Sequence, residues 1–429
     1  MDAHRLHLSA SPRVGAGPLR DGTALPPPSA WEGRPLWAEI DLDAIEANVA
    51  ALARRAGQAE FVAMVKANAY GHGAVAVSRA ALNAGASRLG VACLDEARQL
   101  REAGIDAPIL VLAHTPVEQA PAAVALGVTL TVNSTGLAGA LSEAAAAAGR
   151  RADVHIKVDS GLNRYGRPAD EAVELAEAVR QMPGLRVEGL FTHFATADET
   201  DKQFMHQQLR EFSSAAERLP WINVRHCSNT ASLLDEPDIS FDMVRCGIGI
   251  YGLYPSGEVS RSSVNLSPAL ALKSRLARIK TLSAGETVSY GRRWTARGGE
   301  VLGLVMCGYG DGYPRRLSNI SSVRLGDALV PIRGTIAMDM MMVDITSGAA
   351  GATEGAEVTI IGGRPGNGVS AEDLGEQAGT ISYEIVTSIA ARVPRLYTRA
   401  GRVVEFQTLN DPFPNPWPPS PAAPIHAGR

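Results

Sequence analysis

Residues 61–73 read Phe-Val-Ala-Met-Val-Lys-Ala-Asn-Ala-Tyr-Gly-His-Gly, an apolar run that stops at Lys66 and is followed by polar residues and glycine. The run Phe61–Lys66 predicts a buried strand. A lysine at the carboxyl end of such a strand can be desolvated. Its amine then loses its proton more easily and can form a Schiff base with a carbonyl cofactor. The alternative is a solvated lysine whose aliphatic stem lies along the surface.

Seven more apolar runs, rich in β-branched residues, lie between alanine-rich stretches with helical spacing. Eight strands alternating with helices over about 230 residues predict an α/β fold, a (β/α)8 barrel of the TIM type, and an open doubly wound sheet is the alternative. Asp43, with Glu46 three residues later, predicts a capping box at the start of a preceding helix. The seven further strands are Leu89–Cys93, Ile109–Ala113, Val128–Val132, Val154–Val158, Val187–Thr192, Val224–Cys227 and Met243–Gly247. The helical stretches between the strands are Ala74–Ala84, Leu94–Ala103, Val117–Leu126, Gly136–Ala148, Ala169–Arg180 and Lys202–Arg218.

The pattern changes after Pro268, where short strands are separated by glycine-rich turns and predict a mostly β C-terminal domain with one helix, Ala371–Ala378. We therefore expect a barrel over residues 35–266 and a β domain over 267–409, with a first strand near 37–41 that could join the β domain. Residues 1–34 and the proline-rich residues 410–429 are expected to be disordered tails. The predicted strands of the β domain are Val301–Met306, Val323–Leu325, Leu329–Ile332, Met341–Ile345 and Glu357–Ile361.

The composition narrows the class of protein. Hydrophobic residues make up 45% and charged residues 20% of the 429 residues, so a large core is possible. A net charge of -4 and 5% aromatic residues give no sign of nucleic-acid binding. No apolar run approaches the roughly 20 residues that span a membrane. The N-terminal residues lack the apolar segment of a secretory signal. The cysteines form no C-x-x-C pair, so we expect no metal site, no disulfide framework and a cytoplasmic location. They are Cys93, Cys227, Cys246 and Cys307.

Polar residues stand where the predicted barrel strands end, which is where such barrels place their chemistry. Arg164 follows the fifth strand, His193 follows the sixth, His226 lies in the seventh and Arg245 lies in the eighth. Each has a simpler explanation, since His193 could be a core histidine and Arg245 an ion-pair partner of Asp242.

The loops after the last two strands often bind a phosphate in barrels of this type, so Thr230, Gly247 and Ile248 are phosphate candidates. The two glycines of this loop, Gly247 and Gly249, could equally be ordinary turn residues. A lysine together with a phosphate cradle suggests pyridoxal phosphate as the cofactor.

From Leu36 to Phe406 the chain resembles the alanine racemases, enzymes that use pyridoxal phosphate and have a barrel followed by a β domain. The motifs that carry the resemblance occur in the family's order and spacing. They are Val65–Gly73, Lys157–Gly166, Thr192–Asp198, Met243–Gly247, Val288–Gly291, Gly308–Tyr313, Met338–Asp339 and Ile381–Glu384.

The resemblance implies a racemase that interconverts L-alanine and D-alanine and supplies D-alanine for peptidoglycan. Lys66 would carry the cofactor and act as one base, and Tyr290 would reach in from a partner subunit as the other. Two bases on opposite faces of a planar centre can invert it without turning the substrate. The active species would be a head-to-tail homodimer with two composite sites.

The resemblance also implies roles around the cofactor. Arg245 would donate to the pyridine nitrogen, supported by His193 and His226. Arg164 and the N–H of Met338 would bind the substrate carboxylate, with Arg164 also at the cofactor's phenolate oxygen. Lys157 matches a lysine that is carbamylated in many relatives, and an ammonium paired with Asp159 is the alternative. Further cofactor contacts would come from Tyr70, Asn229, Thr230, Gly247, Ile248 and Tyr383, and supporting or corridor residues would be Tyr309, Asp198 and Asp339.

One departure from the family pattern concerns the corridor by which substrate reaches the site. Many relatives have arginine after the glycine that precedes the Met-Asp pair, where this chain has Thr335 and a displaced Arg333. Alternative functions are a serine or broader-specificity racemase, a decarboxylase, and a non-enzymatic carrier of the cofactor. Decarboxylases of similar architecture set a carboxylate against the pyridine nitrogen, which Arg245 disfavours. Tyr290 in a β domain disfavours a carrier.

Overall fold

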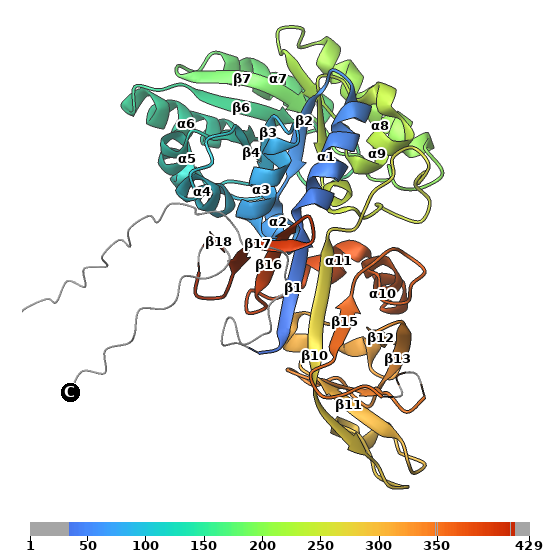
Figure 1. The fold of residues 1–429 in the computed structure, drawn as a ribbon. Helices are drawn as coiled ribbons and strands as arrows, with labels where there is room; N and C mark the ends of the chain where they lie inside the picture. The colour runs from blue at the N-terminus through green and yellow to red at the C-terminus, as the bar shows by residue number, and fades with distance from the viewer. Residues whose placement is uncertain (1–33, 348, 350, 412, 417–429) are drawn as a thin grey trace, which may run out of the picture.

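The computed structural model describes residues 34–347, 349, 351–411 and 413–416. It contains an eight-stranded parallel sheet with the strand order β8-β7-β6-β5-β4-β3-β2-β9. An isolated parallel bridge between Asn229 and Arg245 joins the two outermost strands and closes the barrel. The predicted (β/α)8 barrel is therefore confirmed (Figure 1).

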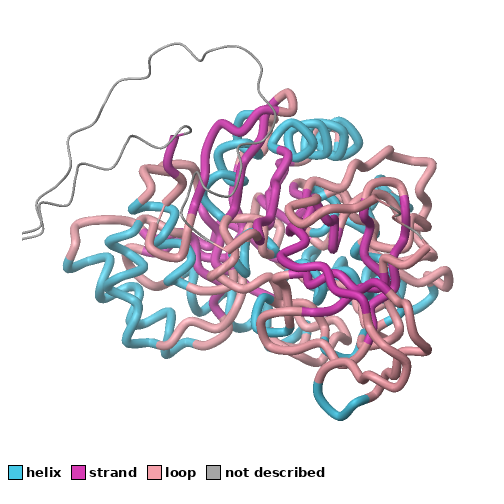
Figure 2. The backbone as a smooth tube through the Cα atoms, turned by 60° about the horizontal axis from the view of Figure 1, so that its bottom comes forward, coloured by secondary structure: helices cyan, strands magenta, loops and turns pink. Residues whose placement is uncertain are grey.

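All eight predicted barrel strands are present, each shifted by no more than two residues at either end. Helices lie outside them (Figure 2), as expected for parallel strands joined by crossover connections. The strands are β2 (Glu60–Met64), β3 (Arg88–Val91), β4 (Ile109–Val111), β5 (Thr129–Val132), β6 (Ala152–Lys157), β7 (Leu185–Phe191), β8 (Val224–His226) and β9 (Met243–Cys246). The helices between and after them are α3 (Ala74–Asn83), α4 (Leu94–Glu102), α5 (Ala120–Leu126), α6 (Thr135–Ala147), α7 (Ala169–Arg180), α8 (Gln203–Glu217) and α9 (Thr230–Asp235).

The capping box predicted from Asp43 and Glu46 is wrong. Helix α1 (Leu42–Ala56) begins two residues earlier, with Asp41 as the N-cap whose carboxylate accepts hydrogen bonds from two backbone N–H groups of the first turn. Asp43 and Glu46 instead form ion pairs of 3.4 and 2.6 Å with Arg399. Arg399 belongs to strand β16 (Arg395–Arg399), so these two acids join α1 to the second domain.

The second domain is built on a ten-stranded sheet with the order β11-β14-β13-β12-β15-β10-β1-β16-β17-β18. Its longest strand, β10 (Leu270–Thr281), pairs with β1, β15 and β11 and so connects both halves of the sheet. Strand β1 (Leu36–Asp41) comes before the barrel in the chain but lies here, between β10 and β16 (Figure 1). The remaining elements are β11 (Val301–Val305), β12 (Ser322–Leu325), β13 (Ala328–Arg333), β14 (Met341–Asp344), β15 (Glu357–Ile361), β17 (Arg402–Gln407), β18 (Asn415–Pro416), α10 (Ala371–Gln377) and α11 (Ser382–Thr387).

Of the two segments expected to be disordered, residue 34 and residues 410, 411 and 413–416 are described, and both parts make defined contacts. Strand β18 pairs with β17 although residues 410–429 were expected to be disordered. At the other end, Arg34 donates to both carboxylate oxygens of Asp311 at 2.9 and 3.0 Å. Residues 1–33 and 417–429 lie outside the described residues.

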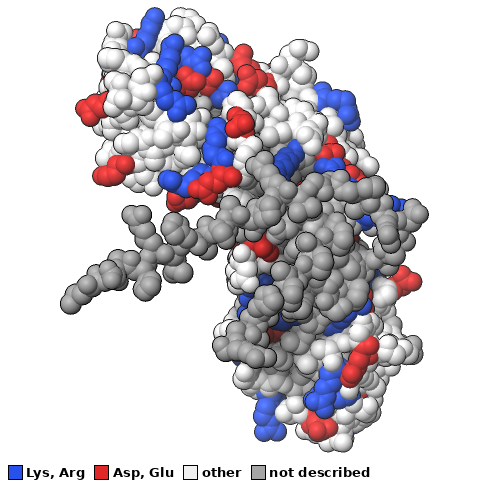
Figure 3. All heavy atoms as spheres, turned by 60° about the vertical axis from the view of Figure 1, so that its left-hand side comes forward, with Lys and Arg blue, Asp and Glu red and all other residues white. Residues whose placement is uncertain are grey.

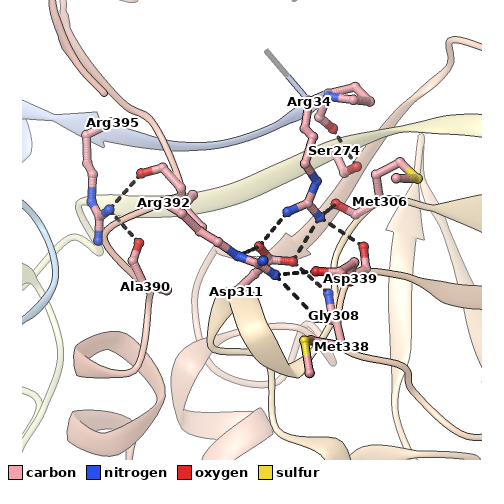
Figure 4. Close-up of polar contacts among 12 residues, drawn as sticks. Arg34, Ser274, Met306, Gly308, Asp311, Met338, Asp339, Ala390, Arg392 and Arg395 are labelled. Atoms are coloured by element: carbon pink, nitrogen blue, oxygen red, sulfur yellow. Dashed lines mark hydrogen bonds and ion pairs between the residues drawn. The ribbon is translucent and has the colours of Figure 1, made fainter. Parts of the chain in front are cut away.

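The two domains meet beside the segment that carries Lys66. The buried guanidinium of Arg395 donates to the Gly71 carbonyl oxygen at 3.2 and 3.3 Å. It also donates to the carbonyls of Ile389 and Val393, and to that of Ala390 (Figure 4). Gly71 has a φ of +83°, and a Cβ there would lie 2.1 Å from the Val386 carbonyl oxygen of α11. Only glycine permits this approach.

Two surface properties bear on partners. On the face shown in Figure 3, acidic and basic side chains are interspersed over the described surface. Among the helices of the described residues, none is long and apolar enough to cross a membrane.

Candidate active site at the carboxyl ends of the barrel strands

Lys66 does not end a strand as predicted, but opens a left-handed turn two residues after β2. In the segment α2 (Lys66–Tyr70), the last four residues have φ values of 50–52°. Such backbone costs an L-residue about 1–2 kcal/mol, so it persists only where neighbours hold it. Glu96 accepts from the N–H groups of Ala67 at 2.6 Å and Ala92 at 2.7 Å, and Asn68 Oδ1 accepts from the N–H of Ala74 at 2.9 Å.

Four cationic side chains lie at this end of the barrel: Lys66, Lys157, Arg164 and Arg245. Burial, together with the charge of Arg164, lowers the pKa of Lys66. Burial and then the charges of Arg245 and Arg164 lower the pKa of Lys157 to about 8. Among the described residues, none of these four side chains has an ion-pair partner. The pocket therefore favours neutral amines and an anionic ligand.

Arg245 is fully enclosed and holds two histidines. Its guanidinium contacts His226 Nδ1 at 2.7 Å and His193 Nδ1 at 3.2 Å, and donates to the carbonyls of Thr192 at 2.8 Å and Cys227 at 3.1 Å. Burial, with the charge of Arg245 next, lowers the pKa of both histidines well below the usual value. Both imidazoles are therefore neutral at pH 7. The simpler explanation, an ion pair of Arg245 with Asp242, does not hold, since Asp242 accepts from the N–H of Arg225 instead.

The loops after β8 and β9 form a cradle with two tyrosines. The N–H of Gly247 donates to Thr230 Oγ1 at 3.1 Å, and a Cβ at Gly247 would lie 2.5 Å from the Tyr70 hydroxyl. Tyr383 of α11 lies 6.0 Å from Tyr70, centroid to centroid. Ile248 is buried at the start of a 3-10 turn, Ile248–Tyr251. The candidates Tyr70, Thr230, Gly247, Ile248 and Tyr383 are thus brought to one place.

Asn229 caps the helix that follows β8. Its side chain accepts from the N–H of Ser232 at 3.1 Å, and the Ser232 hydroxyl accepts from the N–H of Asn229 at 3.0 Å. This capping box starts α9 and positions Thr230, the next residue. Asn229 therefore shapes the cradle through the backbone.

Lys157 ends β6 between two aromatic rings, with its Nζ 5.4 Å from the centroid of Tyr165 and 5.7 Å from that of Phe191. The alternative partner, Asp159, accepts from the N–H groups of Gly161 and Asn163 at 3.1 and 2.9 Å. Asp159 therefore stabilises its own turn, and the structure gives no ion pair between it and Lys157.

Three predicted site residues of the β domain lie on its surface and not at Lys66. Tyr290, Met338 and Tyr309 are 72%, 51% and 41% exposed. Among the described residues, no hydrogen bond links any of them to the barrel. A single chain therefore leaves these side chains free to contact a second molecule.

A buried carboxylate holds the segment that presents Tyr309 and Met338 (Figure 4). Asp311 is fully buried and accepts from Arg34, from Arg392 Nε at 2.8 Å and from the N–H of Gly308 at 2.9 Å. Arg392 also pairs with Asp339 at 2.8 Å. Arg392 therefore joins the carboxylates of Asp311 and Asp339.

Sequence reasoning missed the role of Thr335. Its hydroxyl donates to the Tyr290 carbonyl at 2.7 Å, and its own carbonyl accepts from the Ser289 hydroxyl at 2.5 Å. Ser289 has a φ of +60°, so the loop before Tyr290 is strained. Arg333 points elsewhere and pairs with Asp344 at 3.2 Å. The only sequence signal at Thr335 was that many relatives have arginine at this position.

A (β/α)8 barrel with a desolvated lysine and a phosphate cradle at its strand ends, joined to a β domain, defines a class of barrel enzymes that bind anionic small molecules. Residues 40–255 match the family "Alanine racemase, N-terminal domain", and residues 269–397 match "Alanine racemase, C-terminal domain". The chain belongs to the alanine racemase family.

Individual relatives agree with this assignment. The chain is 46% identical to an alanine racemase of Desulfosudis oleivorans over 375 residues, which cover 84% of this chain and 96% of the relative. It superposes on the alanine racemase of Clostridium difficile 630 with a TM-score of 0.84 at 34% identity, covering 88% of this chain and 99% of that one. For the alanine racemase of Bacillus anthracis with bound L-Ala-P, the TM-score is 0.81 at 38% identity, with 88% and 98% covered.

Replacing Thr335 by valine should loosen the loop that carries Tyr290. The change removes one buried hydrogen bond, worth about 1 kcal/mol, so amide exchange in residues 288–293 should become about fivefold faster. Hydrogen exchange followed by mass spectrometry measures this effect. Thr335→Ser keeps the hydroxyl and should exchange like the wild type. Equal protection in Thr335→Val would show that the hydroxyl does not hold the loop.

Proposed function

We propose that this protein is an alanine racemase that uses pyridoxal phosphate and two bases, Lys66 and the partner's Tyr290. The observation that carries the proposal is the pairing of a desolvated Lys66 in a cationic pocket with a surface-exposed Tyr290 on an anchored loop. The family uses pyridoxal phosphate, and its members interconvert the two enantiomers of alanine.

The residues present fit the cofactor. The loop at Gly247 leaves a space that a Cβ at this position would fill, and the hydroxyls of Tyr70 and Thr230 lie beside it. Such a space suits a phosphate. The guanidinium groups of Arg164 and Arg245, which form no ion pair among the described residues, suit a ligand with several negative charges. When bound, pyridoxal phosphate supplies an aldehyde for the Lys66 amine and a ring that withdraws electrons from the substrate Cα. Tyr383 and the N–H of Ile248 complete the proposed phosphate contacts.

Arg245 would donate a hydrogen bond to the ring nitrogen. A guanidinium keeps its proton at working pH, so the nitrogen would stay unprotonated and the ring a moderate electron sink. No carboxylate contacts this guanidinium among the described residues. Decarboxylases of similar architecture would require one at the ring, and this argues for racemisation.

The substrate would lie between the two bases. Arg164, which is exposed beside Lys66, and the N–H of Met338 from the partner subunit would bind its carboxylate. Lys66 would hold or take the Cα proton on one face, and the partner's Tyr290 would do so on the other. Tyr309 and Asp198 would line the corridor, while Asp339 and Thr335 support it. A serine or broader-specificity racemase would use the same residues.

We also assign the protein to the cytoplasm and its product to peptidoglycan synthesis. Free cysteines support the location, because Cys227, Cys246 and Cys307 are buried and unpaired. The bacterial sources of the relatives support the role.

An exchange assay tests the reaction. The purified protein with pyridoxal phosphate is incubated with L-alanine in D2O, and the products are separated by chiral chromatography and weighed by mass spectrometry. We expect D-alanine that carries deuterium at Cα, and no release of amine or carbon dioxide. Carbon dioxide release would indicate a decarboxylase. Turnover of serine but not alanine would keep the two-base chemistry and refute the proposed substrate.

Mixing two inactive variants tests the composite site. Lys66→Ala and Tyr290→Phe should each lose nearly all activity. After dissociation and reassociation, a mixture should regain roughly a quarter of the wild-type rate, since about half of the dimers are mixed and each mixed dimer has one intact site. A mixture that stays inactive although mixed dimers form would show that both bases come from the same chain.

We propose that Lys157 is carbamylated, because an amine with a pKa of about 8 has a far larger neutral fraction near pH 7 than an ordinary lysine, and the neutral amine can add carbon dioxide. At constant dissolved carbon dioxide, the carbamate should increase as the pH rises from 7 to 9. Carbon-13 NMR with labelled bicarbonate would show one protein-bound signal. That signal should vanish in Lys157→Arg and persist in Lys202→Arg, where the lysine is paired with Asp235 at 2.7 Å. Absence of the signal in the wild type at pH 9 would refute carbamylation.

A further inference from the structure

A line of buried polar side chains runs from Arg245 down the inside of the barrel, away from the proposed site. Arg245 contacts His226 Nδ1 at 2.7 Å, and His226 Nε2 contacts His155 Nδ1 at 2.8 Å. His155 Nε2 contacts Glu188 Oε2 at 2.9 Å. Both imidazoles are completely buried, and the Glu188 side chain is 15% exposed. None of the proposed catalytic steps uses His155 or Glu188.

A β-bulge and a glycine make room for this line. Val154 pairs with Val187, but His155 pairs with Gly189, so Glu188 is an extra residue in β7. A bulge turns a side chain away from the face that strict alternation gives it, and here the carboxylate reaches His155. A Cβ at Gly189 would lie 2.6 Å from the His155 ring. The backbone is therefore shaped around the imidazole.

Glu188 is ionised. Burial raises its pKa, but hydrogen bonds from His155 and Arg88 outweigh burial and lower the pKa far below the usual value. Arg88 forms two bonds of 2.9 and 3.1 Å with the carboxylate, and Arg186 lies 3.7 Å away.

The groups at the two ends of the line, Glu188 and Arg245, allow only one direction of donation for the hydrogen bonds between them. A carboxylate only accepts, so the proton of His155 sits on Nε2 and its Nδ1 is bare. His226 must then donate from Nε2, which leaves its Nδ1 bare. Arg245 only donates, and it faces that bare Nδ1. The line cannot conduct protons to the site, because a guanidinium does not release its proton.

We propose that Glu188 and His155 are positioning residues for Arg245. Two neutral histidines in one tautomer transmit the negative charge of Glu188, and this strengthens and orients the bond to the guanidinium. The negative charge of Glu188 thus balances part of the positive charge of Arg245, although three hydrogen bonds separate the two groups. A carboxylate in direct contact with the ring nitrogen would stabilise the protonated form of that nitrogen, so this distance preserves the donor role of Arg245. The importance of that role rests on the proposed function, but the arrangement of protons does not.

Nitrogen-15 NMR of the cofactor-free and the loaded protein, labelled at histidine and arginine, tests the arrangement. In the wild type, His155 and His226 should both be neutral with the proton on Nε2. In Glu188→Gln, the bonded side-chain signals of Arg245 and the ring signals of His226 should shift. Glu236→Gln is the matched control, because it breaks a histidine–glutamate contact of 2.7 Å with His206 at the surface. It should leave both sets of signals unchanged.

A second pair of variants covers the case in which Glu188→Gln does not fold. His155→Phe keeps a ring but removes both bonds and should shift the Arg245 signals. In His155→Gln, an amide can accept from His226 and donate to Glu188, so it should restore them. Cofactor affinity should fall about tenfold in Glu188→Gln and in His155→Phe, but not in Glu236→Gln, the size expected for loss of an outer partner.

A proton on Nδ1 of either histidine, or Arg245 signals that do not change in Glu188→Gln and His155→Phe, would overturn the proposal. If the NMR result is as expected but the protein does not racemise alanine, the positioning role stands and the proposed function fails. If racemisation is found with unchanged Arg245 signals, the reverse holds.

Discussion

The hydrogen bonds between the Arg395 guanidinium and the Gly71 carbonyl are the contact on which the proposed site depends. They fasten the β domain to the end of the left-handed turn that begins at Lys66. A planar group with five donors can also hold the three carbonyls of Ile389, Ala390 and Val393 in one plane, which an ammonium could not. The position of Lys66 is therefore a property of two docked domains and not of the barrel alone.

The electrostatics of the strand ends follow a single principle. The charges of Arg164 and Arg245 lower the pKa values of the lysines beside them, and among the described residues none of the four cationic side chains forms an ion pair. The folded protein carries the repulsion among these cations until an anionic ligand binds. Binding and folding are then linked, because any ligand that relieves the repulsion stabilises the native state by mass action. The carboxylates that matter most, Glu96 and Glu188, act on backbone N–H groups and on histidine.

Much of the fold could be predicted from alternation of apolar runs and helical stretches, including all eight barrel strands and five strands of the β domain. Strand β10 was missed because Lys273, Arg275, Arg278 and Lys280 interrupt its apolar residues, although every second residue from Leu270 to Leu276 is buried. Strands β16–β18 were missed for want of a clear apolar run. In the site, motif positions located the residues that lie together at the strand ends, among them Tyr70, Thr230 and Gly247. The left-handed turn, the role of Thr335 and the bulge at Glu188 depend on contacts between distant segments, which no local pattern records.

The position of β1 has a consequence for how the chain is made. Its residues, 36–41, leave the ribosome before the barrel does, but their neighbours in the sheet, β10 and β16, begin at residues 270 and 395. The first strand must therefore wait, with two unpaired edges, while the whole barrel is synthesised and folds behind it. Such exposed edges invite pairing with other chains. A fragment that starts after the barrel would lack a strand from the interior of its own sheet, so the β domain cannot be completed until the segments on both sides of the barrel have met.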